Sequence, residues 1–538
     1  MSSNAGVRPI FSPKPCTQDT SNETNVIPAL SSQWLPLLSC PADFPLELFE
    51  IAISQLIHHP EYNSTLILRS ETISEWTVHP NPSSPPSPFP PKIPHIPGLH
   101  PISNVHRKLL PRRPGRDAPL EQNCTLYGYD EGEHADVPCT LVLTPLGDPS
   151  SLPYYHPAVS HLAFRYISHT KFGALGNTVV DTDRPGNILQ IEVTPLPNVP
   201  TDPGSRLYRT SLALLDTLHR YGWGALTNYQ KRVQHDCIVP REIYQDVYLL
   251  MRARHKHLVD EWREATDPLK HVFEDIGIAT FLMLLWKEMY ADDNTATSST
   301  KDNIPNGNAT VVPWSTWPRP PGGFIDLGCG NGLLTHILTA EGYTGHGFDL
   351  RARTSWAHYP LATQAALLLG HLPPSVSSPI SDPHKFDFPL NAFLIGNHAD
   401  ELTPWIPVLA TLTRSSGYIS IPCCAWTFDE RFSRSGGSEW FIPADNVDFI
   451  SSLNLGGGST KSAYSSYRIW LARLSEWVGW RVECETLRIP STRNWALVGR
   501  TRTGDGDSAH ARASAIVASV VRRGAFKTRK PEGKAGDH

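Results

Sequence analysis

The chain has 538 residues, of which 40% are hydrophobic, so it can form hydrophobic cores and is too long for one compact domain. Its formal net charge is −5, and its nine cysteines include no Cys-x-x-Cys pair and no cluster with zinc spacing. No secretory signal and no apolar run long enough to cross a membrane is visible. The length predicts two or three units. The cysteines predict reduced thiols and no metal site, and the absence of an apolar span predicts no membrane partner. Reduced thiols fit the cytoplasm or the nucleus, and we place the protein in the cytoplasm.

Positive charge is distributed unevenly along the chain. Residues 461–538 contain fifteen Lys and Arg against seven Asp and Glu, and residues 106–116 contain five cations and no acid. Segments of this kind fit a polyanionic partner such as RNA. A solvated basic surface explains the charge equally well.

The first two hundred residues predict a disordered start and a β-containing region. Residues 1–40 are rich in Ser, Thr, Asn and Pro without periodicity, which is typical of disorder. A mixed region with β-strands is expected over 41–200, with a proline-rich linker at 80–101. Gly and Pro clusters separate its short strand-like runs, which are 124–129, 140–144, 161–167 and 189–194.

Apolar residues then take up helical spacing, which predicts a helical subdomain over 201–290. One helix is expected to begin at Asp267-Pro268, because Pro is favoured in the first turn of a helix. It includes the apolar run Ile276–Trp286, which is too short to span a bilayer and is expected to be buried. The polar segment 291–318 is expected to be a flexible loop.

From residue 319 the pattern alternates between strand and helix. Residues 324–327 and 343–349 have strand character, and the segment from Gly332 to Glu341 between them has helical character. This alternation predicts an α/β domain with a parallel sheet over 319–502, followed by a basic tail over 503–538.

The segment Asp326–Gly332 reads Asp-Leu-Gly-Cys-Gly-Asn-Gly and follows an apolar strand. Glycines allow tight dihedral angles and close approach of a ligand. The acid before the glycines and the absence of a Gly-x-x-Gly ending distinguish it from a dinucleotide fingerprint. Asp349, 23 residues after Asp326, has the spacing of a carboxylate that binds a ribose diol. The candidate cofactor residues here are Asp326, Gly328, Cys329, Gly330, Asn331, Gly332 and Asp349.

Two further segments carry candidate site residues. A predicted strand at 393–396 is followed by four polar side chains, Asn397, His398, Asp400 and Glu401, more than a turn requires. At the carboxyl end of that strand they would border the cofactor. The second segment contains cations and aromatic rings that suit phosphate contacts and base stacking. A helix face followed by a hairpin would also explain them. These candidate RNA-binding residues are Lys461, Tyr464, Arg468 and Arg493.

Several segments together resemble one narrow family, the eukaryotic tRNA (uracil-2′-O-)-methyltransferases, within the class I S-adenosylmethionine-dependent methyltransferases. The resemblance covers roughly Leu126 to Arg500, and its segments are Thr266–Ile276, Phe324–Gly332, Gly347–Arg351, Ile395–Leu402 and Ile421–Cys424.

The resemblance implies a Rossmann-like domain with a mostly parallel seven-stranded sheet and S-adenosylmethionine as cofactor. Asp326 and the glycines would face its methionine moiety, Asp349 would bind its ribose, and Asn397 would border the methyl donor. It also implies methylation of uridine 44 in serine tRNAs. The resemblance does not indicate whether the activity requires a protein partner.

A ribose hydroxyl needs orientation and a proton acceptor. Asp400 is the first candidate for this acceptor, with Glu401 or His398 behind it. Two other functions stay open at this point. A C5-pyrimidine RNA methyltransferase would use Cys423 as nucleophile, and an RNA-binding scaffold would use the fold without catalysis.

Overall fold

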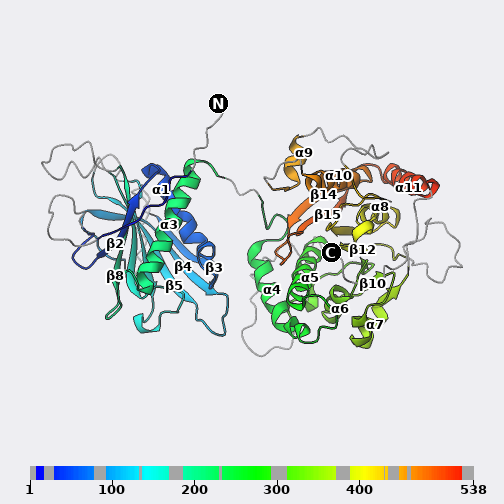
Figure 1. Cartoon of the computed structure of the whole chain (residues 1–538), viewed down its shortest axis with the longest axis horizontal. Helices are drawn as coiled ribbons and strands as arrows, with labels where there is room; N and C mark the ends of the chain where they lie inside the picture. Colours follow the sequence, from blue (N-terminus) through cyan, green and yellow to red (C-terminus); the bar gives the residue numbers. More distant parts are fainter. Residues whose placement is uncertain are drawn as a thin grey trace. The chain divides into compact units, whose positions relative to one another are not determined.

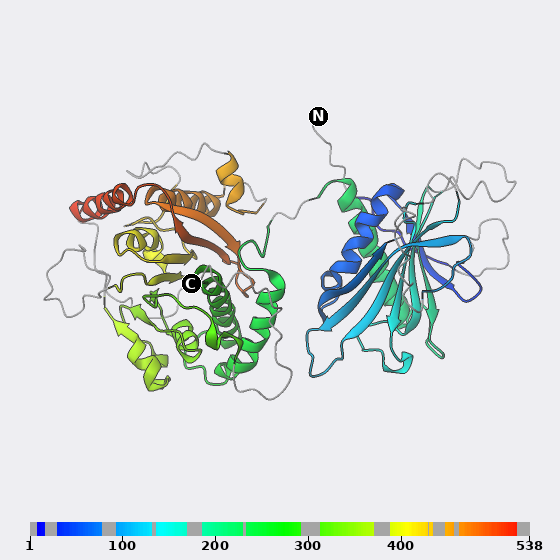
Figure 2. The ribbon, with the colours of Figure 1, turned by 180° about the vertical axis from the view of Figure 1, so that it is seen from behind.

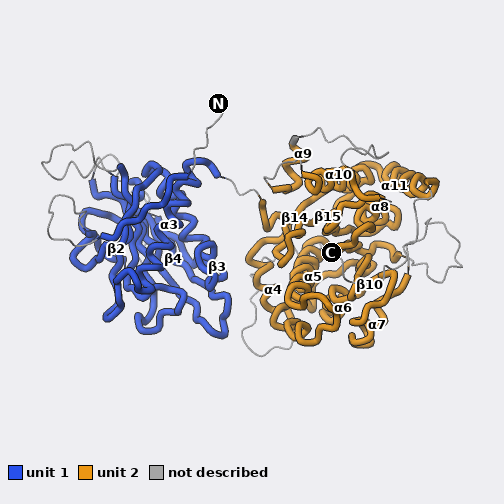
Figure 3. Tube along the Cα trace, in the orientation of Figure 1, with its two compact units in different colours: residues 1–230 blue, residues 231–538 orange. Residues whose placement is uncertain are grey.

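The chain is described by a computed structural model over residues 8–16, 29–77, 93–131, 136–168, 186–229, 233–291, 312–370, 388–428, 430–433, 447–456 and 462–523. It forms two compact units, Met1–Gln230 and Lys231–His538 (Figure 3). Their boundary falls inside the segment 201–290 that the sequence predicts as one helical subdomain. Helix α3 (Arg206–Leu226) belongs to the first unit, whereas α4 (Arg241–His255) and α5 (Pro268–Met289) belong to the second.

The first unit contains an antiparallel eight-stranded sheet in the order β1-β2-β8-β7-β6-β5-β4-β3 (Figure 1). Helix α1 (Phe49–His58) and helix α3 pack against each other and against this sheet. The four predicted strand-like runs lie in β5 to β8 and are confirmed. The strands are β1 (Lys14–Pro15), β2 (Leu35–Pro41), β3 (Ile67–Thr77), β4 (Leu99–Pro111), β5 (Leu120–Tyr129), β6 (Thr140–Leu146), β7 (Val159–Ile167) and β8 (Ile188–Pro195).

Strand β8 shows why this sheet is covered on both faces. Its apolar residues Leu189, Ile191 and Val193 alternate along the strand and join the core formed with α1 and α3. Glu192, on the opposite face, is fully buried, pairs with Arg165 and accepts a hydrogen bond of 2.9 Å from the Leu30 amide. The segment around Leu30 therefore covers the second face of the sheet.

The prediction of disorder over residues 1–40 is wrong for its last part. Strand β2 forms an antiparallel ladder with β8, and β1 pairs with β2. The polar residues before β2 hide this strand in the composition of the segment, although Leu37, Leu38 and Cys40 of β2 are buried in the core with α1 and α3. Similarly, β4 begins at Leu99, inside the predicted proline-rich linker at 80–101, of which residues 80–92 lie outside the described residues.

The basic segment 106–116 is partly internal. Arg107, in β4, is only 3% exposed. Its guanidinium donates to the carbonyl oxygens of Leu56 (2.8 Å) and Ile57 and to Gln122 Oε1 (3.0 and 2.6 Å). This cation stabilises the contact between α1 and the sheet and does not face a polyanion.

The second unit contains a seven-stranded sheet in the order β11-β10-β9-β12-β13-β15-β14. Neighbouring strands from β11 to β13 are parallel, whereas β15 is antiparallel to both β13 and β14, so the sheet is mixed. The predicted α/β class is confirmed. The strands are β9 (Phe324–Leu327), β10 (Gly345–Asp349), β11 (Leu367–Leu369), β12 (Phe393–Asn397), β13 (Gly417–Ile421), β14 (Trp480–Thr486) and β15 (Trp495–Arg502).

Helices cover both faces of this sheet (Figure 2). On one face α4, α5 and α6 (Leu333–Ala340) form a core with Phe324 and Phe393. On the other, α8 (Trp405–Leu412), α10 (Ala463–Trp477) and α11 (Gly506–Arg522) form a core with Ile325. Alternate residues of a strand thus serve opposite cores, as a sheet buried on both faces requires. Helix α11 lies in the segment expected only as a basic tail, and α7 (Leu361–Ala366) contacts α6.

Helix α5 confirms the predicted buried helix. Asp267 caps its start by accepting a hydrogen bond of 3.0 Å from the Leu269 amide, with Pro268 in the first turn. The apolar run Ile276–Trp286 is buried against the sheet. Among the described residues, no helix combines the length and the apolar character that crossing a membrane requires.

Candidate functional site

The glycine-rich turn follows β9 at the carboxyl edge of the second unit's sheet. Gly328, Gly330 and Gly332 have positive φ angles of 75°, 55° and 76°, which residues with a Cβ rarely adopt. A Cβ at Gly332 would also lie 2.8 Å from the Leu367 side chain. Asn331 Oδ1 accepts a hydrogen bond of 3.0 Å from the Leu333 amide and so fixes the start of α6. The turn therefore depends on its glycines for its shape.

Asp349, at the end of the neighbouring strand β10, is joined to this turn. Its Oδ2 accepts a hydrogen bond of 2.9 Å from the Gly330 amide, and its Oδ1 accepts one of 3.2 Å from the Arg351 amide. Parallel pairing of β9 and β10 places the two strand ends side by side. The structure thus brings together the two acids that the sequence singles out.

Asp326 is buried, at 1% exposure, beneath the same turn. Its Oδ2 accepts a hydrogen bond of 3.2 Å from Thr335 Oγ1, whereas its Oδ1 has no hydrogen-bond partner among the described residues. Burial raises the pKa of Asp326 to about 7. The hydrogen bond from Thr335 lowers this pKa, and the negative charge of Asp349 raises it, but burial has the largest effect. A buried acceptor without a donor points to a ligand that supplies one.

Asn397 ends β12, the strand on the other side of β9. Its Nδ2 donates a hydrogen bond of 3.2 Å to Asp275 Oδ1 on helix α5, and its own Oδ1 has no partner among the described residues. Burial raises the pKa of Asp275 well above its usual value, and the negative charges of Glu274 and Asp326 raise it further. Asp275 is a site residue that the sequence analysis missed, although a Glu-Asp pair within an otherwise apolar helix was a visible signal.

His398 forms a second link to α5. Its Nε2 lies 2.9 Å from Oε1 of Glu274, which is 4% exposed, and the His398 side chain is 29% exposed. Burial alone would raise the pKa of Glu274, but the hydrogen bond and charge of His398, with Lys270 and His271, lower it. The positive φ of His398, 51°, turns the chain sharply after β12.

Asp400 contacts the loop after β13. Its Oδ1 accepts a hydrogen bond of 3.1 Å from Cys423 Sγ, and it also has a positive φ of 44°. Burial, followed by the Asp400 charge, raises the pKa of the Cys423 thiol well above its usual value. A thiol held protonated is a poor nucleophile. Glu401 is half-buried in the short turn Asp400–Leu402.

The predicted RNA contacts do not form one exposed patch. Arg468 is buried and donates a hydrogen bond of 2.9 Å to the Leu455 carbonyl, so its guanidinium ties α10 to the preceding loop. Tyr464 donates a hydrogen bond of 2.6 Å to the Pro422 carbonyl, and exposed Arg493 lies 3.9 Å above its ring. Lys461 lies outside the described residues. Arg493 and Tyr464 therefore border the Cys423 loop, whereas Arg468 has a structural role.

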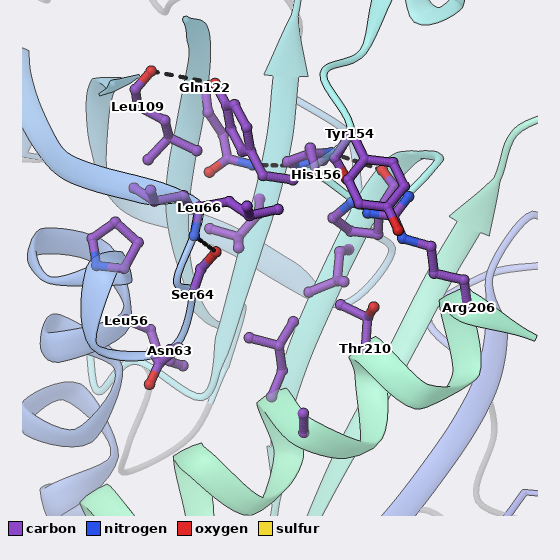
Figure 4. Close-up of a pocket in the computed structure, with 18 of the residues that line it drawn as sticks. Leu56, Asn63, Ser64, Leu66, Leu109, Gln122, Tyr154, His156, Arg206 and Thr210 are labelled. Atoms are coloured by element: carbon purple, nitrogen blue, oxygen red, sulfur yellow. Dashed lines mark hydrogen bonds between the residues drawn. The ribbon is translucent and has the colours of Figure 1, made fainter. Parts of the chain in front are cut away.

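The first unit has a separate cavity of about 460 Å³ (Figure 4). Leu56, Leu66 and Leu109 contribute apolar walls. Gln122 and His156 line it and lie 2.9 Å apart, between Nε2 atoms. Burial lowers the pKa of His156 to about 4, against the effect of its hydrogen bond to the Pro157 carbonyl. The predicted cofactor and catalytic residues all lie in the other unit, so this cavity is not part of the site they form.

Comparison with known families gives one match in each unit. The description "TRM44-like, N-terminal bet v1-like domain" matches residues 13–232, and "Predicted AdoMet-dependent methyltransferase" matches residues 238–313 and 310–374. The second match covers the glycine-rich turn and Asp349, and it implies S-adenosylmethionine as the cofactor.

Three curated relatives illustrate the similarity over the whole chain, and all bear the name tRNA (uracil-O(2)-)-methyltransferase. The Schizosaccharomyces pombe protein is 34% identical over 87% of this chain and 86% of its own length. The Neurospora crassa protein is 34% identical over 88% and 87%, and the Yarrowia lipolytica protein is 32% identical over 88% and 91%. No solved structure matches the chain significantly.

Proposed function

Because the chain belongs to the tRNA (uracil-O(2)-)-methyltransferase family, we propose that it methylates the ribose 2′-oxygen of uridine 44 in serine tRNAs. The single observation that supports this most is the similarity to these enzymes over both units, joined to a glycine-rich turn and acids in cofactor-binding positions. We place this activity in the cytoplasm, where the nine free thiols would stay reduced.

S-adenosylmethionine supplies the methyl group as a sulfonium. Asp349, fixed by the Gly330 amide, would hold the adenosine ribose. Asp326 Oδ1 and Asn397 Oδ1 are the buried acceptors available to the ammonium group and the methyl-donor end. Asp275 fixes the orientation of the Asn397 amide and is therefore a positioning residue.

We propose His398, in place of Asp400, as the proton acceptor for the ribose hydroxyl. The hydrogen bond to Glu274 occupies His398 Nε2 and leaves Nδ1 as the atom that can accept a proton. The buried Glu274 carboxylate would stabilise the resulting imidazolium. The Asp400 carboxylate is less suited because it already accepts the Cys423 hydrogen bond.

The two other functions find less support. A C5-pyrimidine methyltransferase needs a thiolate, whereas the Asp400 carboxylate beside Cys423 favours the protonated thiol. A non-catalytic RNA scaffold does not account for the unpaired, buried acceptors at Asp326 and Asn397.

The test is methylation of transcribed serine tRNA by the full chain, followed by mass spectrometry of the digested nucleosides. The expected product is uridine methylated on the sugar. A matched tRNA with 2′-deoxyuridine at position 44 lacks the acceptor hydroxyl and should gain no methyl group. Methylation of the deoxyuridine base would instead establish the C5 reaction. A serine tRNA without its long variable arm would show whether that arm is recognised.

A further inference from the structure

Three side chains that bind metals in other proteins converge beside His398. They are Asp400, Cys423 and Cys424, and each offers one ligand atom; these three atoms all lie within 4.8 Å of one another. Cys423 Sγ is 3.1 Å from Asp400 Oδ1. We propose that these three side chains bind one Zn²⁺ ion at the edge of the sheet where the acceptor ribose must approach. The proposed role of this ion rests on the proposed function, but its binding does not.

The topology of the sheet explains the convergence. Strands β12 and β13 are parallel neighbours, with Asn397 opposite Ile421. Asp400 lies three residues after the first strand end and Cys423 two residues after the second. Parallel strands release their following loops at the same edge. Ligands from two loops and one adjacent Cys pair therefore meet in space, without the Cys-x-x-Cys spacing that a search of the sequence detects.

The ligand types and distances select the ion. Zn²⁺ displaces the protons of the thiols that it binds, so Cys423 and Cys424 would bind it as thiolates although the free Cys423 thiol is protonated. Thiolate ligands favour zinc over magnesium or calcium, which prefer oxygen. Zn–S bonds of about 2.3 Å and Zn–O bonds of about 2.0 Å place neighbouring ligand atoms of a tetrahedral site roughly 3.5–3.8 Å apart. Atoms within 4.8 Å of one another reach that geometry through side-chain movements of about an ångström.

Contacts around the cluster hold both loops in place. The His398 amide donates a hydrogen bond of 3.2 Å to the Ile421 carbonyl, which joins the two loops at their start. The Tyr464 hydroxyl donates to the Pro422 carbonyl, directly before Cys423. Ligands of a metal site need outer contacts of this kind to keep their orientation. They are consistent with a site that is largely preformed.

Three protein ligands leave one tetrahedral position open, as in catalytic rather than structural zinc sites. Asp400 is exposed and both cysteines are half-buried, so a substrate can reach them. A hydroxyl bound to Zn²⁺ has a lowered pKa. The ribose O–H bond would break with its proton passing to His398. The oxygen would then bond to the methyl carbon, while the electron pair of the broken carbon–sulfur bond stays on sulfur.

The experiment uses the full chain, reduced, stripped with a chelator and titrated with Co²⁺, whose thiolate complexes absorb in the near ultraviolet. We expect one equivalent of Co²⁺ with thiolate absorption. Cys423→Ser and Cys424→Ser should each weaken binding at least tenfold and lose about half of the absorption. Asp400→Asn should weaken binding and keep the thiolate absorption. Cys237→Ser, which removes an exposed thiol of the same unit, should behave as the parent chain.

The absence of thiolate absorption in the parent chain, or undiminished absorption in Cys423→Ser, would overturn the proposal. Circular dichroism and S-adenosylmethionine calorimetry establish that each variant folds, and the two cysteine variants are independent tests if one fails. A chain that binds Co²⁺ in this way but leaves the uridine ribose unmethylated keeps the metal site and loses the proposed function. An active chain without the Co²⁺ site loses only the metal.

Discussion

Arg107 in the first unit and Asp326 in the second are both charged side chains with almost no exposure, but their hydrogen bonding differs. Arg107 donates to two backbone carbonyls of α1 and to Gln122. Asp326 accepts from Thr335 through one oxygen, and the other oxygen has no partner among the described residues. A buried charge that the fold satisfies supports stability, whereas one left partly unsatisfied costs stability and marks a ligand site.

The largest expected effect is on the satisfied charge. Arg107→Met should lower the free energy of unfolding of the first unit by roughly 3–5 kcal/mol, because buried acceptors lose their donors. Urea denaturation of the full chain, followed by hydrogen exchange at the β4 and β5 amides, measures this change. Lys108→Met removes the neighbouring, half-buried cation and should change stability little. Equal losses in both variants would show that the buried hydrogen bonds do not matter.

The pair of Glu274 and His398 lies between these two cases: the buried carboxylate of Glu274 has a hydrogen-bond partner, but that partner, His398, is partly exposed. His398→Gln should lower kcat on serine tRNA about 100-fold, because a glutamine cannot accept the hydroxyl proton. Glu274→Gln should lower it less, by about tenfold. Binding of S-adenosylmethionine, measured by calorimetry, should be unchanged in both. Unchanged turnover in His398→Gln would return the role of proton acceptor to Asp400 or Glu401.

Asp326→Asn tests the unsatisfied charge itself. The dissociation constant of S-adenosylmethionine should rise about tenfold or more, since a charged hydrogen bond to a ligand contributes about 1.5–3 kcal/mol. Stability without ligand should stay the same or increase, because a desolvated carboxylate is removed. Calorimetry and urea denaturation on one sample measure both. If Asp326→Asn were less stable but bound S-adenosylmethionine normally, Asp326 would support the fold, as Arg107 does, and would not support ligand binding.

The smallest effect is a pH dependence of the same interaction. Burial raises the pKa of Asp326 to about 7 in the ligand-free chain. Below that pH the carboxyl is protonated, and a cationic ligand must displace the proton. Affinity for S-adenosylmethionine should therefore fall about fivefold between pH 7 and pH 6 and change little above pH 8. Calorimetric titrations from pH 5.5 to 8 test this, and Asp326→Asn should flatten the profile.

Local patterns allowed the glycine-rich turn, Asp326 and Asp349 to be predicted. All lie within one strand-turn-helix-strand segment, in which the chain itself limits the possible geometry. The buried helix α5 was predictable for the same reason, from its cap and its apolar run. The partners of Asn397 and His398 on that helix were not, because they are 122 and 124 residues away in the sequence.

The sequence by itself therefore determined the α/β class of the second unit, the glycine-rich turn and the acid that follows it, since these depend on local dihedral angles and short spacings. Only the tertiary structure decided which polar groups are satisfied. It buried Arg107 and Arg468, paired Glu274 with His398 and joined Asp400 to Cys423. Hydrogen bonding and burial depend on which elements pack together, and distant contacts leave no periodic signal along the chain.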